Sequence, residues 1–376
     1  MNKIILLLLV FLVGCGGDGG DPIPSPPDAT KFLEIHTINV QQGDSTLVIG
    51  PNGTTVLIDG GDTGRGTDTI VPYLKRLGIE NSLDYILNTH RHEDHLGGLD
   101  EVMKAGYDVK NEIWANGSTT ITTVANTNFM AAATSTTAKS VKTVSLGESI
   151  ALGNGAKATV VAVSGNILGT TTPFTATNEN DKSVALLIQY GLFDYMMTGD
   201  LGGGESTEDR NCTGRSTGQE NMESILVQAI MPGGAVSLLT ATGVDALMVP
   251  HHGSESSMNR DYMNGMSPSI AIIGVGDGQG ANFEHPRKDI VEKVLMAGAG
   301  KPCITAPPAL VLQTDEGSPI PIGANASTAG HVVGDVVIKT NGVSTFQVSG
   351  SGRIRSGSPD ERVGAGIAPP KSFPLD

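Results

Sequence analysis

The chain has 376 residues, of which 39% are hydrophobic and 17% charged, so it can bury a large core and is too apolar to be wholly disordered. Its formal net charge of −15 excludes a surface that binds DNA tightly and without sequence preference, because such binding needs basic side chains that displace counterions from the phosphates. Three cysteines are too few for a disulfide framework, and the sequence leaves open whether Cys212 and Cys303 pair.

The N-terminal residues resemble a bacterial lipoprotein signal. The apolar run Ile4–Val13 is too short to span a bilayer and has the length of a signal-peptide core. Leu12-Val13-Gly14-Cys15 resembles a lipobox, in which the cysteine becomes lipidated. We therefore expect a signal peptide over residues 1–14, then a lipidated Cys15 at the start of a Gly- and Pro-rich tether over residues 15–30. This arrangement implies an extracytoplasmic protein that is lipid-anchored in the periplasm, at the outer membrane or on the cell surface.

From Lys31 onward, short β-rich runs alternate with helical patterns. Strands are expected where residues are continuously apolar or alternate in polarity, and helices where apolar residues recur every three or four positions. The expected strands are Phe32–Val40, Thr46–Ile49, Thr55–Ile58, Tyr85–Leu87, Ala158–Val163, Ser183–Gln189, Tyr195–Thr198, Ala246–Val249, Ile270–Val275, Val336–Lys339 and Ser344–Val348. The expected helices are Asp68–Leu77, Glu220–Ile230 and Arg287–Met296. Gly117–Thr143 is left open as a helical insertion or a loop, while 202–218 is expected to be a loop and 351–376 a flexible tail.

Three histidines and an aspartate gather within Asn88–Leu99, namely His90, His92, Asp94 and His95. Imidazole and carboxylate groups are ligands for Zn²⁺, Mn²⁺ or iron. His90 and His92, two positions apart after a strand, can reach one ion, and Asp94 and His95 at the next turn can reach a second. The sequence therefore predicts a metal centre.

The His-x-His-x-Asp-His pattern is similar to the signature of the metallo-β-lactamase superfamily of metal-dependent hydrolases. The resemblance extends from Phe32 to Val348 and implies one hydrolase domain over residues 31–350, an α+β fold with an αββα four-layer sandwich. Three further motifs fall in the expected order. Asp59 matches the aspartate that supports the metal loop by hydrogen bonds, and Asp200 matches the aspartate that bridges two metals. In Val249-Pro250-His251-His252-Gly253 the implied ligand is His252, with His251 as the alternative.

A finer resemblance is to the hydrolase domain of ComEC-type DNA-uptake proteins. It rests on Val40-Gln41-Gln42-Gly43-Asp44-Ser45, Pro250-His251-His252-Gly253-Ser254 and Glu284-His285-Pro286. No histidine occurs between Leu96 and Gly199, where many superfamily members have one. Asn180-Asp181-Lys182-Ser183 resembles an element of this branch, so Asn180 and Asp181 are expected behind an oxygen-richer metal shell. Both Zn²⁺ and Mn²⁺, and one or two occupied sites, therefore stay open.

The resemblance implies a hydrolase that uses two divalent ions, Zn or Mn, and a metal-activated hydroxide. The implied metal ligands are His90 and His92 for one ion, Asp94, His95 and His252 for the other, and Asp200 between them. Asp94 and His285 are expected to take part in catalysis, His285 as proton donor or phosphate clamp. A phosphodiester in a small molecule, nucleic acid or envelope polymer is the first expected substrate. Amide or ester hydrolysis of a β-lactam or lactone, and a non-catalytic surface-binding lipoprotein, are the alternatives.

Overall fold

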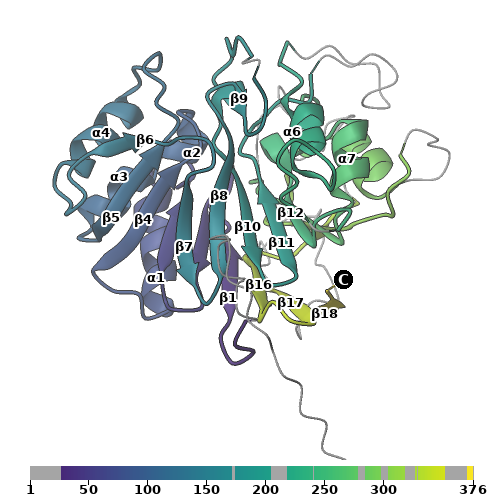
Figure 1. Cartoon of the computed structure of the whole chain (residues 1–376). Coiled ribbons are helices and arrows are strands. Elements are labelled where there is room, and N and C mark those ends of the chain that lie inside the picture. The colour runs from purple at the N-terminus through teal and green to yellow at the C-terminus, as the bar shows by residue number, and fades with distance from the viewer. Residues whose placement is uncertain are drawn as a thin grey trace, which may run out of the picture.

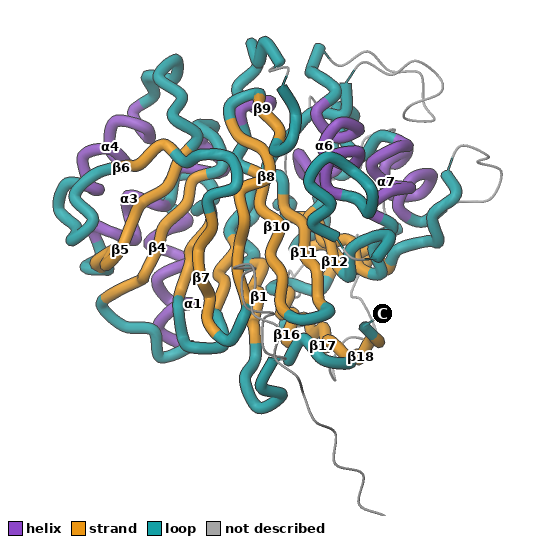
Figure 2. The backbone as a smooth tube through the Cα atoms, viewed as in Figure 1, coloured by secondary structure: helices purple, strands orange, loops and turns teal. Residues whose placement is uncertain are grey.

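The computed structural model describes residues 27–171, 174–204, 218–239, 241–277, 284–297, 304–317, 327, 329–351 and 371–375. Within these residues, two mixed β-sheets pack face to face and helices cover both outer faces (Figure 1). The strands of the two sheets fill the middle of the molecule, and the helices lie to either side (Figure 2).

The first sheet has the strand order β18-β17-β16-β1-β2-β3-β4-β5-β6. Its strands β3 to β6 run parallel, whereas the pairs from β18 to β3 are antiparallel. The bounds are β1 (Leu33–Thr37), β2 (Thr46–Ile49), β3 (Thr55–Ile58), β4 (Ser82–Asn88), β5 (Asp108–Ala115), β6 (Val141–Thr143), β16 (Val336–Thr340), β17 (Thr345–Gly350) and β18 (Lys371–Pro374).

The second sheet has the order β15-β14-β13-β12-β11-β10-β8-β7, with β9 paired to β8. Strands β11 to β15 are parallel, and the pairs from β7 to β11 are antiparallel. The bounds are β7 (Ser149–Gly153), β8 (Ala156–Val163), β9 (Asn166–Ile167), β10 (Ala185–Tyr190), β11 (Phe193–Met197), β12 (Ala246–Met248), β13 (Ile270–Ile273), β14 (Leu310–Gln313) and β15 (His331–Val332).

Two groups of helices form the outer layers. The first sheet is covered by η1 (Gly66–Ile70), α1 (Val71–Arg76), α2 (Glu93–Leu96), α3 (Leu99–Lys104) and α4 (Val124–Ala133). The second sheet is covered by α6 (Met222–Ile230), α7 (Arg260–Met266) and η4 (Asp289–Leu295). Polar side chains cap several of these helices: Thr123 accepts a hydrogen bond from the Asn126 N–H at α4, and Asn259 accepts one from the Tyr262 N–H at α7.

Hydrophobic cores built from the described residues fill the spaces between the four layers. In β3, Val56 and Ile58 face the core between the sheets, whereas Leu57 faces the core beneath η1, α1 and α3. In β13, Ile270 and Ile272 face the same central core, while the alternate residues Ala271 and Ile273 face α6 and α7. This alternation is the period of two that a strand imposes, and both faces are apolar because both are covered. The predicted αββα sandwich is confirmed.

Several sequence predictions need correction at the level of elements. The open stretch Gly117–Thr143 contains both α4 and β6. The expectation of a flexible tail is wrong for its last residues, because Lys371–Pro374 pair with β17 and the Phe373 ring stacks on Phe346 with centroids 5.1 Å apart. The strands β5, β7 and β14 were not predicted. Most of the predicted loop at 202–218 lies outside the described residues. No helix among the described residues combines the length and the apolar character needed to cross a bilayer.

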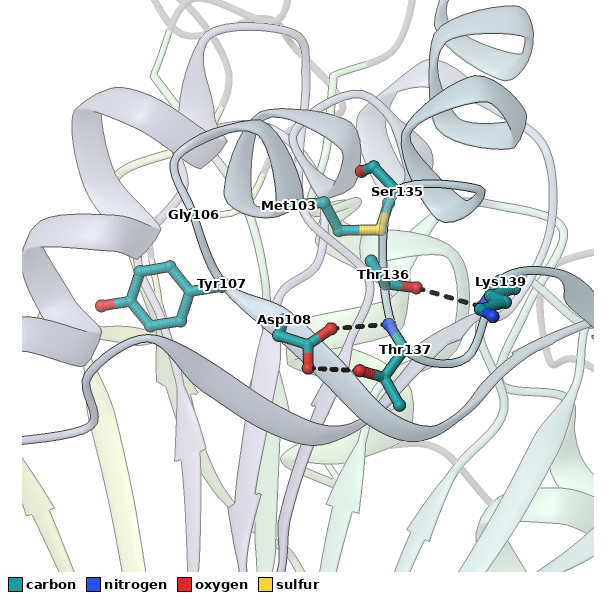
Figure 3. Close-up of a pocket in the computed structure, with 8 residues that line it drawn as sticks. All are labelled: Met103, Gly106, Tyr107, Asp108, Ser135, Thr136, Thr137 and Lys139. Atoms are coloured by element: carbon teal, nitrogen blue, oxygen red, sulfur yellow. Dashed lines mark hydrogen bonds between the residues drawn. The ribbon is translucent and has the colours of Figure 1, made fainter.

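A surface hollow of about 400 Å³ lies between α3 and the segment before β6 (Figure 3). The Asp108 carboxylate at its edge accepts hydrogen bonds from the backbone N–H and the hydroxyl of Thr137, at 2.6 and 2.7 Å. These contacts fasten the link between α4 and β6. Its described lining holds no histidine or cysteine, so it carries no candidate for metal chemistry.

Candidate metal centre

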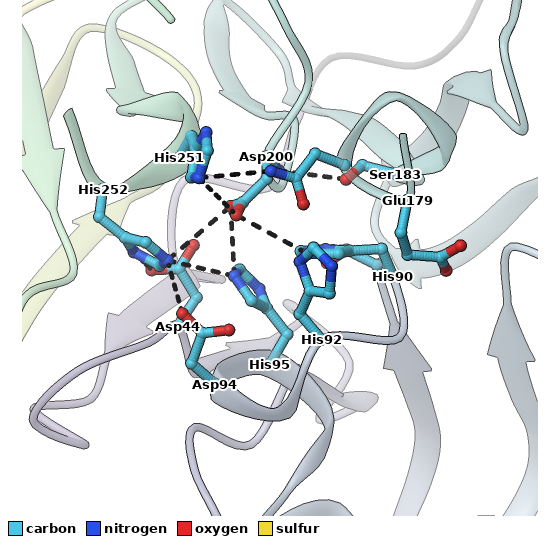
Figure 4. A network of polar contacts seen from close by, with 12 residues as sticks. Asp44, His90, His92, Asp94, His95, Glu179, Ser183, Asp200, His251 and His252 are labelled. Carbon is cyan, nitrogen blue, oxygen red and sulfur yellow. Dashed lines mark hydrogen bonds and ion pairs between the residues drawn. The ribbon is translucent and has the colours of Figure 1, made fainter. Parts of the chain in front are cut away.

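The predicted site residues lie on loops that follow the carboxyl ends of strands in both sheets. In the first sheet, Asp59 follows β3, and the segment from Thr89 to His95 follows β4. In the second sheet, Asp200 follows β11, and His251 and His252 follow β12. The sandwich thus brings residues that are far apart in the sequence into one polar network (Figure 4).

Two groups of side chains could each hold a metal ion. In one, ligand atoms of His90, His92 and Asp200 all lie within 4.8 Å of one another. In the other, those of Asp44, His95 and His252 do so. The predicted Asp94 lies at the second group, where its Oδ2 is 3.3 Å from Nε2 of His252.

Asp200 stands between the two groups, and each of its oxygens faces a different one. Oδ1 lies 3.2 Å from Nε2 of His95 and 3.9 Å from Nε2 of His252. Oδ2 lies 3.7 Å from Nε2 of His90 and 3.6 Å from Nε2 of His251. A carboxylate in this position can serve an ion on either side.

Both histidines of the late pair face the centre. His252 belongs to the group with His95, as the sequence favoured, while His251 faces the oxygen of Asp200 that also faces His90. The two side chains diverge because both residues have left-handed backbone angles, with φ of 50° and 52°. Such angles cost of order 1–3 kcal/mol each in a residue with a Cβ, and they persist where the surrounding structure fixes them.

The outer nitrogens of four histidines are anchored as hydrogen-bond donors. Nδ1 of His95 donates to Oδ2 of Asp59 at 2.8 Å, and Nδ1 of His252 donates to the Gly274 carbonyl at 2.8 Å. Nδ1 of His90 lies 3.1 Å from the Thr89 hydroxyl, and Nδ1 of His251 lies 2.5 Å from the Ser256 hydroxyl. Because the Thr89 hydroxyl itself donates to Asp59 at 2.7 Å, it accepts from His90. With Nδ1 engaged on the outer side, each Nε2 is left facing the centre, as in metal-ligating histidines.

This arrangement of acceptors fits a bound cation. Nε2 of His95 and Nε2 of His252 are only 3.2 Å apart, although both rings already use Nδ1 as the donor. Nε2 of His90 lies 3.1 Å from Nδ1 of His92. The facing Nε2 atoms of His95 and His252 repel at 3.2 Å unless a proton or a cation lies between them, and the Asp200 carboxylate adds negative charge. Imidazole nitrogens with carboxylate oxygens match the ligand preferences of Zn²⁺ and Mn²⁺.

Burial and neighbouring charges shift the pKa values of His90 and His95 in opposite directions. Burial, together with the charge on His95, lowers the pKa of His90 well below its ordinary value. At His95, burial acts in the same direction, but the carboxylates of Asp200 and Asp59 outweigh it and hold the pKa well above the ordinary value. Burial also opposes ionisation of Asp200, yet the surrounding histidines keep its pKa well below the ordinary value. Asp200 is therefore ionised at neutral pH.

Asp59 holds the loop from Asn88 to His95 in place by hydrogen bonds. Its Oδ1 accepts hydrogen bonds from the Asn88 amide and the Thr89 N–H, at 3.1 and 2.8 Å, and its Oδ2 accepts those from Thr89 and His95. Nearby glycines allow the backbones to touch, because a Cβ at Gly60 would come within 2.7 Å of the Leu99 nitrogen. The structure thus puts Asp59 where the sequence assigned its supporting role.

The Asn180-Asp181-Lys182-Ser183 element has divided contacts. The Asn180 amide lies 3.3 Å from Nε2 of His251, and the Ser183 hydroxyl accepts the Asp200 N–H at 3.1 Å. Asp181 is not part of the centre: its carboxylate accepts the Glu220 N–H at 3.1 Å, and it holds the segment after Asp200 in place. The expected place of Asp181 behind the metal shell stays a prediction.

His285 lies beside the late histidine pair. Its ring centroid is 5.7 Å from that of His251 and 6.1 Å from that of His252, and the residue is buried. Burial, helped by the charges on these two histidines, lowers the pKa of His285 to about 3. The imidazole is therefore neutral at pH 7.

The centre opens into one cleft of about 880 Å³, whose lining includes His92, Asp94, Asp200, His251 and His252. Its described lining consists of polar side chains: Gln41, Gln42, Asp62, Arg65, His92, Glu93, Asp94, Asn178, Asn180, Asp200, His251, His252, Asp277 and His285. Arg65 is the one Lys or Arg in this described lining. The cleft thus combines a candidate dinuclear centre with a polar surround.

Two residues of the site were missed by the sequence reasoning. Asp44 lies in the motif that resembles ComEC-type proteins, yet no role was assigned to it; its Oδ1 is 3.4 Å from Nδ1 of His252. Glu179 precedes the Asn180 element, and its carboxylate accepts the Arg91 N–H between the first two histidines at 3.1 Å. Cys15, Cys212 and Cys303 lie outside the described residues.

Comparison with known proteins identifies the family. Residues 38–223, about half of the chain, match the family model of the metallo-beta-lactamase superfamily. The chain is 22% identical over 278 residues to ComE operon protein 3 of Bacillus subtilis, covering 69% of this chain and 30% of that protein. It is 37% identical over 76 residues to recombination protein 2 of Haemophilus influenzae, covering 19% of this chain and 9% of that protein. The chain spans less than a third of the length of either relative.

Solved structures that are similar to the chain have low identity to it. One is a subclass B3 metallo-beta-lactamase from a soil metagenome library, with 17% identity, a TM-score of 0.33, and coverage of 60% of this chain and 79% of that one. Another is a diphosphatase from the PhnP family, with 16% identity, a TM-score of 0.35, and coverage of 65% and 87%. On the match to the family model, the chain belongs to the metallo-β-lactamase superfamily of metal-dependent hydrolases.

Proposed function

We propose that the protein hydrolyses phosphodiesters at a centre of two divalent metal ions. The observation that carries this proposal is the cleft lining, in which every described side chain is polar. Sites for drug-like small molecules are lined mainly by apolar and aromatic side chains around a few polar groups. A cleft without apolar walls suits a charged, strongly hydrated substrate better than a β-lactam or a lactone.

The residues that would hold the ions follow from the two groups. His90, His92 and Asp200, with His251 facing them, would hold one ion, and His95 and His252, with Asp44, Asp94 and Asp200 beside them, would hold the other. Bound there, two divalent ions lower the pKa of a shared water and neutralise charge on a phosphoryl oxygen. Their positive charge also offsets the acidic character of the chain, so that the net charge of −15 does not exclude a phosphate substrate.

Three side chains of the cleft are assigned to binding the diester. His285, a neutral imidazole at pH 7, can donate its ring N–H to a phosphoryl oxygen, which is one of the two roles expected from the sequence. The Asn180 amide lies at the same side of the centre, next to His251. Arg65 supplies the permanent positive charge at the cleft wall, which favours an anionic substrate.

An activity assay tests the proposal. The purified protein, supplemented with Zn²⁺ or Mn²⁺, is given bis-p-nitrophenyl phosphate and, separately, a chromogenic cephalosporin. We expect metal-dependent release of nitrophenol from the diester, its loss in Asp200→Ala, and its retention in Asp194→Asn, a buried carboxylate on β11 near the opposite end from Asp200. Faster turnover of the cephalosporin would favour amide hydrolysis. Undetectable bound metal in the wild type would favour the non-catalytic alternative.

We further propose that Cys15 carries a lipid and tethers the domain to a membrane outside the cytoplasm. The support is the sequence Leu12-Val13-Gly14-Cys15 after an apolar run. Several acyl chains on one cysteine give stable anchoring, since each buried methylene contributes ~0.8 kcal/mol. The wild type should partition into the detergent phase of Triton X-114, and Cys15→Ser should move to the aqueous phase. Equal partitioning of the two proteins would contradict the anchor.

The diester in this setting would belong to extracellular nucleic acid or to an envelope polymer. Hydrolysis of single-stranded DNA and of a purified teichoic-acid-type polymer should be compared under the same metal conditions. We expect no tight retention of DNA without metal, because the net charge of −15 repels the phosphates.

A further inference from the structure

Glu179 is a buried carboxylate that gathers three segments of the chain beside the metal centre (Figure 4). Its Oε1 accepts hydrogen bonds from the Arg91 backbone N–H at 3.1 Å and from the Asn116 amide at 3.0 Å. Its Oε2 accepts those from the Ser118 hydroxyl at 2.7 Å and from the Lys182 ammonium at 3.2 Å. Both oxygens of the carboxylate are thus committed to holding neighbouring segments.

The contact with Arg91 bears directly on two candidate ligands. Arg91 separates His90 from His92, so its peptide N–H determines how the backbone turns between them. With that N–H held by Glu179, Nε2 of His90 and Nδ1 of His92 converge to 3.1 Å. The two rings are edge to face, with centroids 4.8 Å apart. Without the acceptor, a buried N–H would lose its partner and the turn would lose the contact that fixes it.

The same residue also positions the opposite side of that group. Asn180 follows Glu179 in the chain, and its amide lies 3.3 Å from Nε2 of His251. The segment then leads through Ser183, which accepts the Asp200 N–H, into β10 of the second sheet. Arg91, in contrast, follows β4 of the first sheet. Glu179 therefore joins the two sheets at the point where His90, His92 and Asp200 meet.

The second group is supported differently. Asp59 holds His95 directly and reaches His90 only through the Thr89 hydroxyl. His252 is held by the Gly274 carbonyl and lies beside Asp44. The four hydrogen bonds of Glu179 described above involve no residue of this second group. Asp59 thus contacts His95 directly and His90 through Thr89, whereas the four contacts of Glu179 lie on the side of the first group only.

We propose that Glu179 is the positioning residue for His90 and His92, so that its loss weakens the metal ion that these two ligands hold and leaves the other in place. This inference rests on the metal centre of the proposed function, and it holds for any substrate. Losing a side chain that orients metal ligands typically costs about 10- to 100-fold in metal affinity. The loss of affinity is therefore expected for one of the two metal ions only.

Three substitutions separate the parts played by Glu179. Glu179→Ala removes all four contacts. Glu179→Gln keeps an oxygen that can accept from Arg91 and gives up the charge that faces Lys182. Glu179→Asp keeps the charge on a side chain one methylene shorter, which withdraws it from Arg91. The Gln variant is therefore the rescue variant, and the Asp variant repeats the Ala test in case the Ala variant does not fold.

The test is a calorimetric titration of the metal-stripped full-length protein with Zn²⁺, together with the visible spectrum of the Co²⁺ form. We expect two ions in the wild type, and in Glu179→Ala one ion of unchanged affinity and one weakened at least about tenfold. Glu179→Gln should bind both within about threefold of the wild type, and only the Ala and Asp variants should lose part of the Co²⁺ spectrum.

The proposal is overturned if Glu179→Ala binds both ions as tightly as the wild type, if both ions weaken equally, or if Gln does not restore the second ion. These readouts do not involve diester cleavage. A wild type that binds two ions but cleaves no diester would sink the proposed substrate and leave the role of Glu179 standing.

Discussion

Replacing Asp59 by Asn exchanges one carboxylate oxygen for an NH₂ group and should disable one metal ligand. Asp59 is completely buried, and its two oxygens accept four hydrogen bonds. Of the two donors at Oδ1, the backbone N–H of Thr89 can only donate. The carbonyl of the introduced amide side chain must therefore stay on that side, which turns its NH₂ group toward the Thr89 hydroxyl and Nδ1 of His95.

The consequence falls on the tautomer of His95. The Thr89 hydroxyl can rotate and accept from the new NH₂ group, but Nδ1 of His95 can accept only by moving its proton to Nε2. That nitrogen faces Asp200 at 3.2 Å and His252 at 3.2 Å, so the proton would occupy the position of the metal. Supporting contacts of this kind are worth about 10- to 100-fold in metal affinity, or about 1.4–2.7 kcal/mol. The backbone is not perturbed, since asparagine tolerates the φ of 58° at this position.

The assay is a Zn²⁺ titration of the stripped protein, with thermal unfolding in EDTA to measure the fold without metal. We expect Asp59→Asn to lose about 10- to 100-fold in affinity for one or both ions and to unfold in EDTA close to the wild type. Asp181→Asn is the matched control, because its buried carboxylate accepts the Glu220 N–H and lies outside the two ligand groups. A folded Asp59→Asn protein with wild-type Zn²⁺ affinity would refute the tautomer argument.

Three other predictions concern the cleft, the pH dependence of stability and the C-terminal strand. His285→Ala should lower kcat/KM for the diester by about 10²-fold, as removal of one oxyanion donor does, with both ions retained; unchanged kcat/KM would exclude contact with the diester. Burial raises the pKa of Glu223 from 4.5 to about 8. The free energy of unfolding that Glu223 contributes is therefore complete below pH 4.5 and is lost as the pH rises toward 8, at up to about 1.4 kcal/mol per pH unit. Urea unfolding in EDTA should show this decrease with pH in the wild type and a smaller one in Glu223→Gln. Deleting residues 371–376 should remove β18, cost about 2 kcal/mol through the lost packing of Phe373, and expose the edge of β17 to self-association; a monomer with an unchanged urea midpoint would contradict this.

The parts of the fold that could be predicted were those with a strong local pattern. Strands that are covered on both faces, such as Thr55–Ile58 and Ile270–Ile273, are continuously apolar in the sequence and were found within a few residues. The strand Asp108–Ala115 was missed because its first half carries exposed polar residues at the margin of the sheet. The strand Lys371–Pro374 has hardly any apolar pattern, and pairing with β17 is what makes it a strand.

The site residues that could be predicted are likewise those that lie close together in the sequence. His90, His92, Asp94 and His95 lie close together in the sequence, so their common chemistry could be read directly. Asp44 and Glu179 act through contacts with segments far along the chain, and a lone acidic residue in a loop does not indicate such a contact. The direction of His251 was also beyond the sequence, because two consecutive left-handed residues send adjacent side chains toward different groups.

The repulsion among the metal ligands links metal binding to the stability of the sandwich. Nε2 of His95, which follows a strand of the first sheet, and Nε2 of His252, which follows a strand of the second, face one another at 3.2 Å, and only the folded chain brings them together. Zn²⁺ at about 100 times its dissociation constant should stabilise the fold by about 2.7 kcal/mol for each occupied site, measured as a shift of the urea midpoint between EDTA and Zn²⁺. Because the two oxygens of Asp200 face different groups, Asp200→Ala should reduce this shift at both sites, whereas Glu179→Ala should reduce it at one. A shift in Asp200→Ala as large as in the wild type would mean that Asp200 does not stand between two ions.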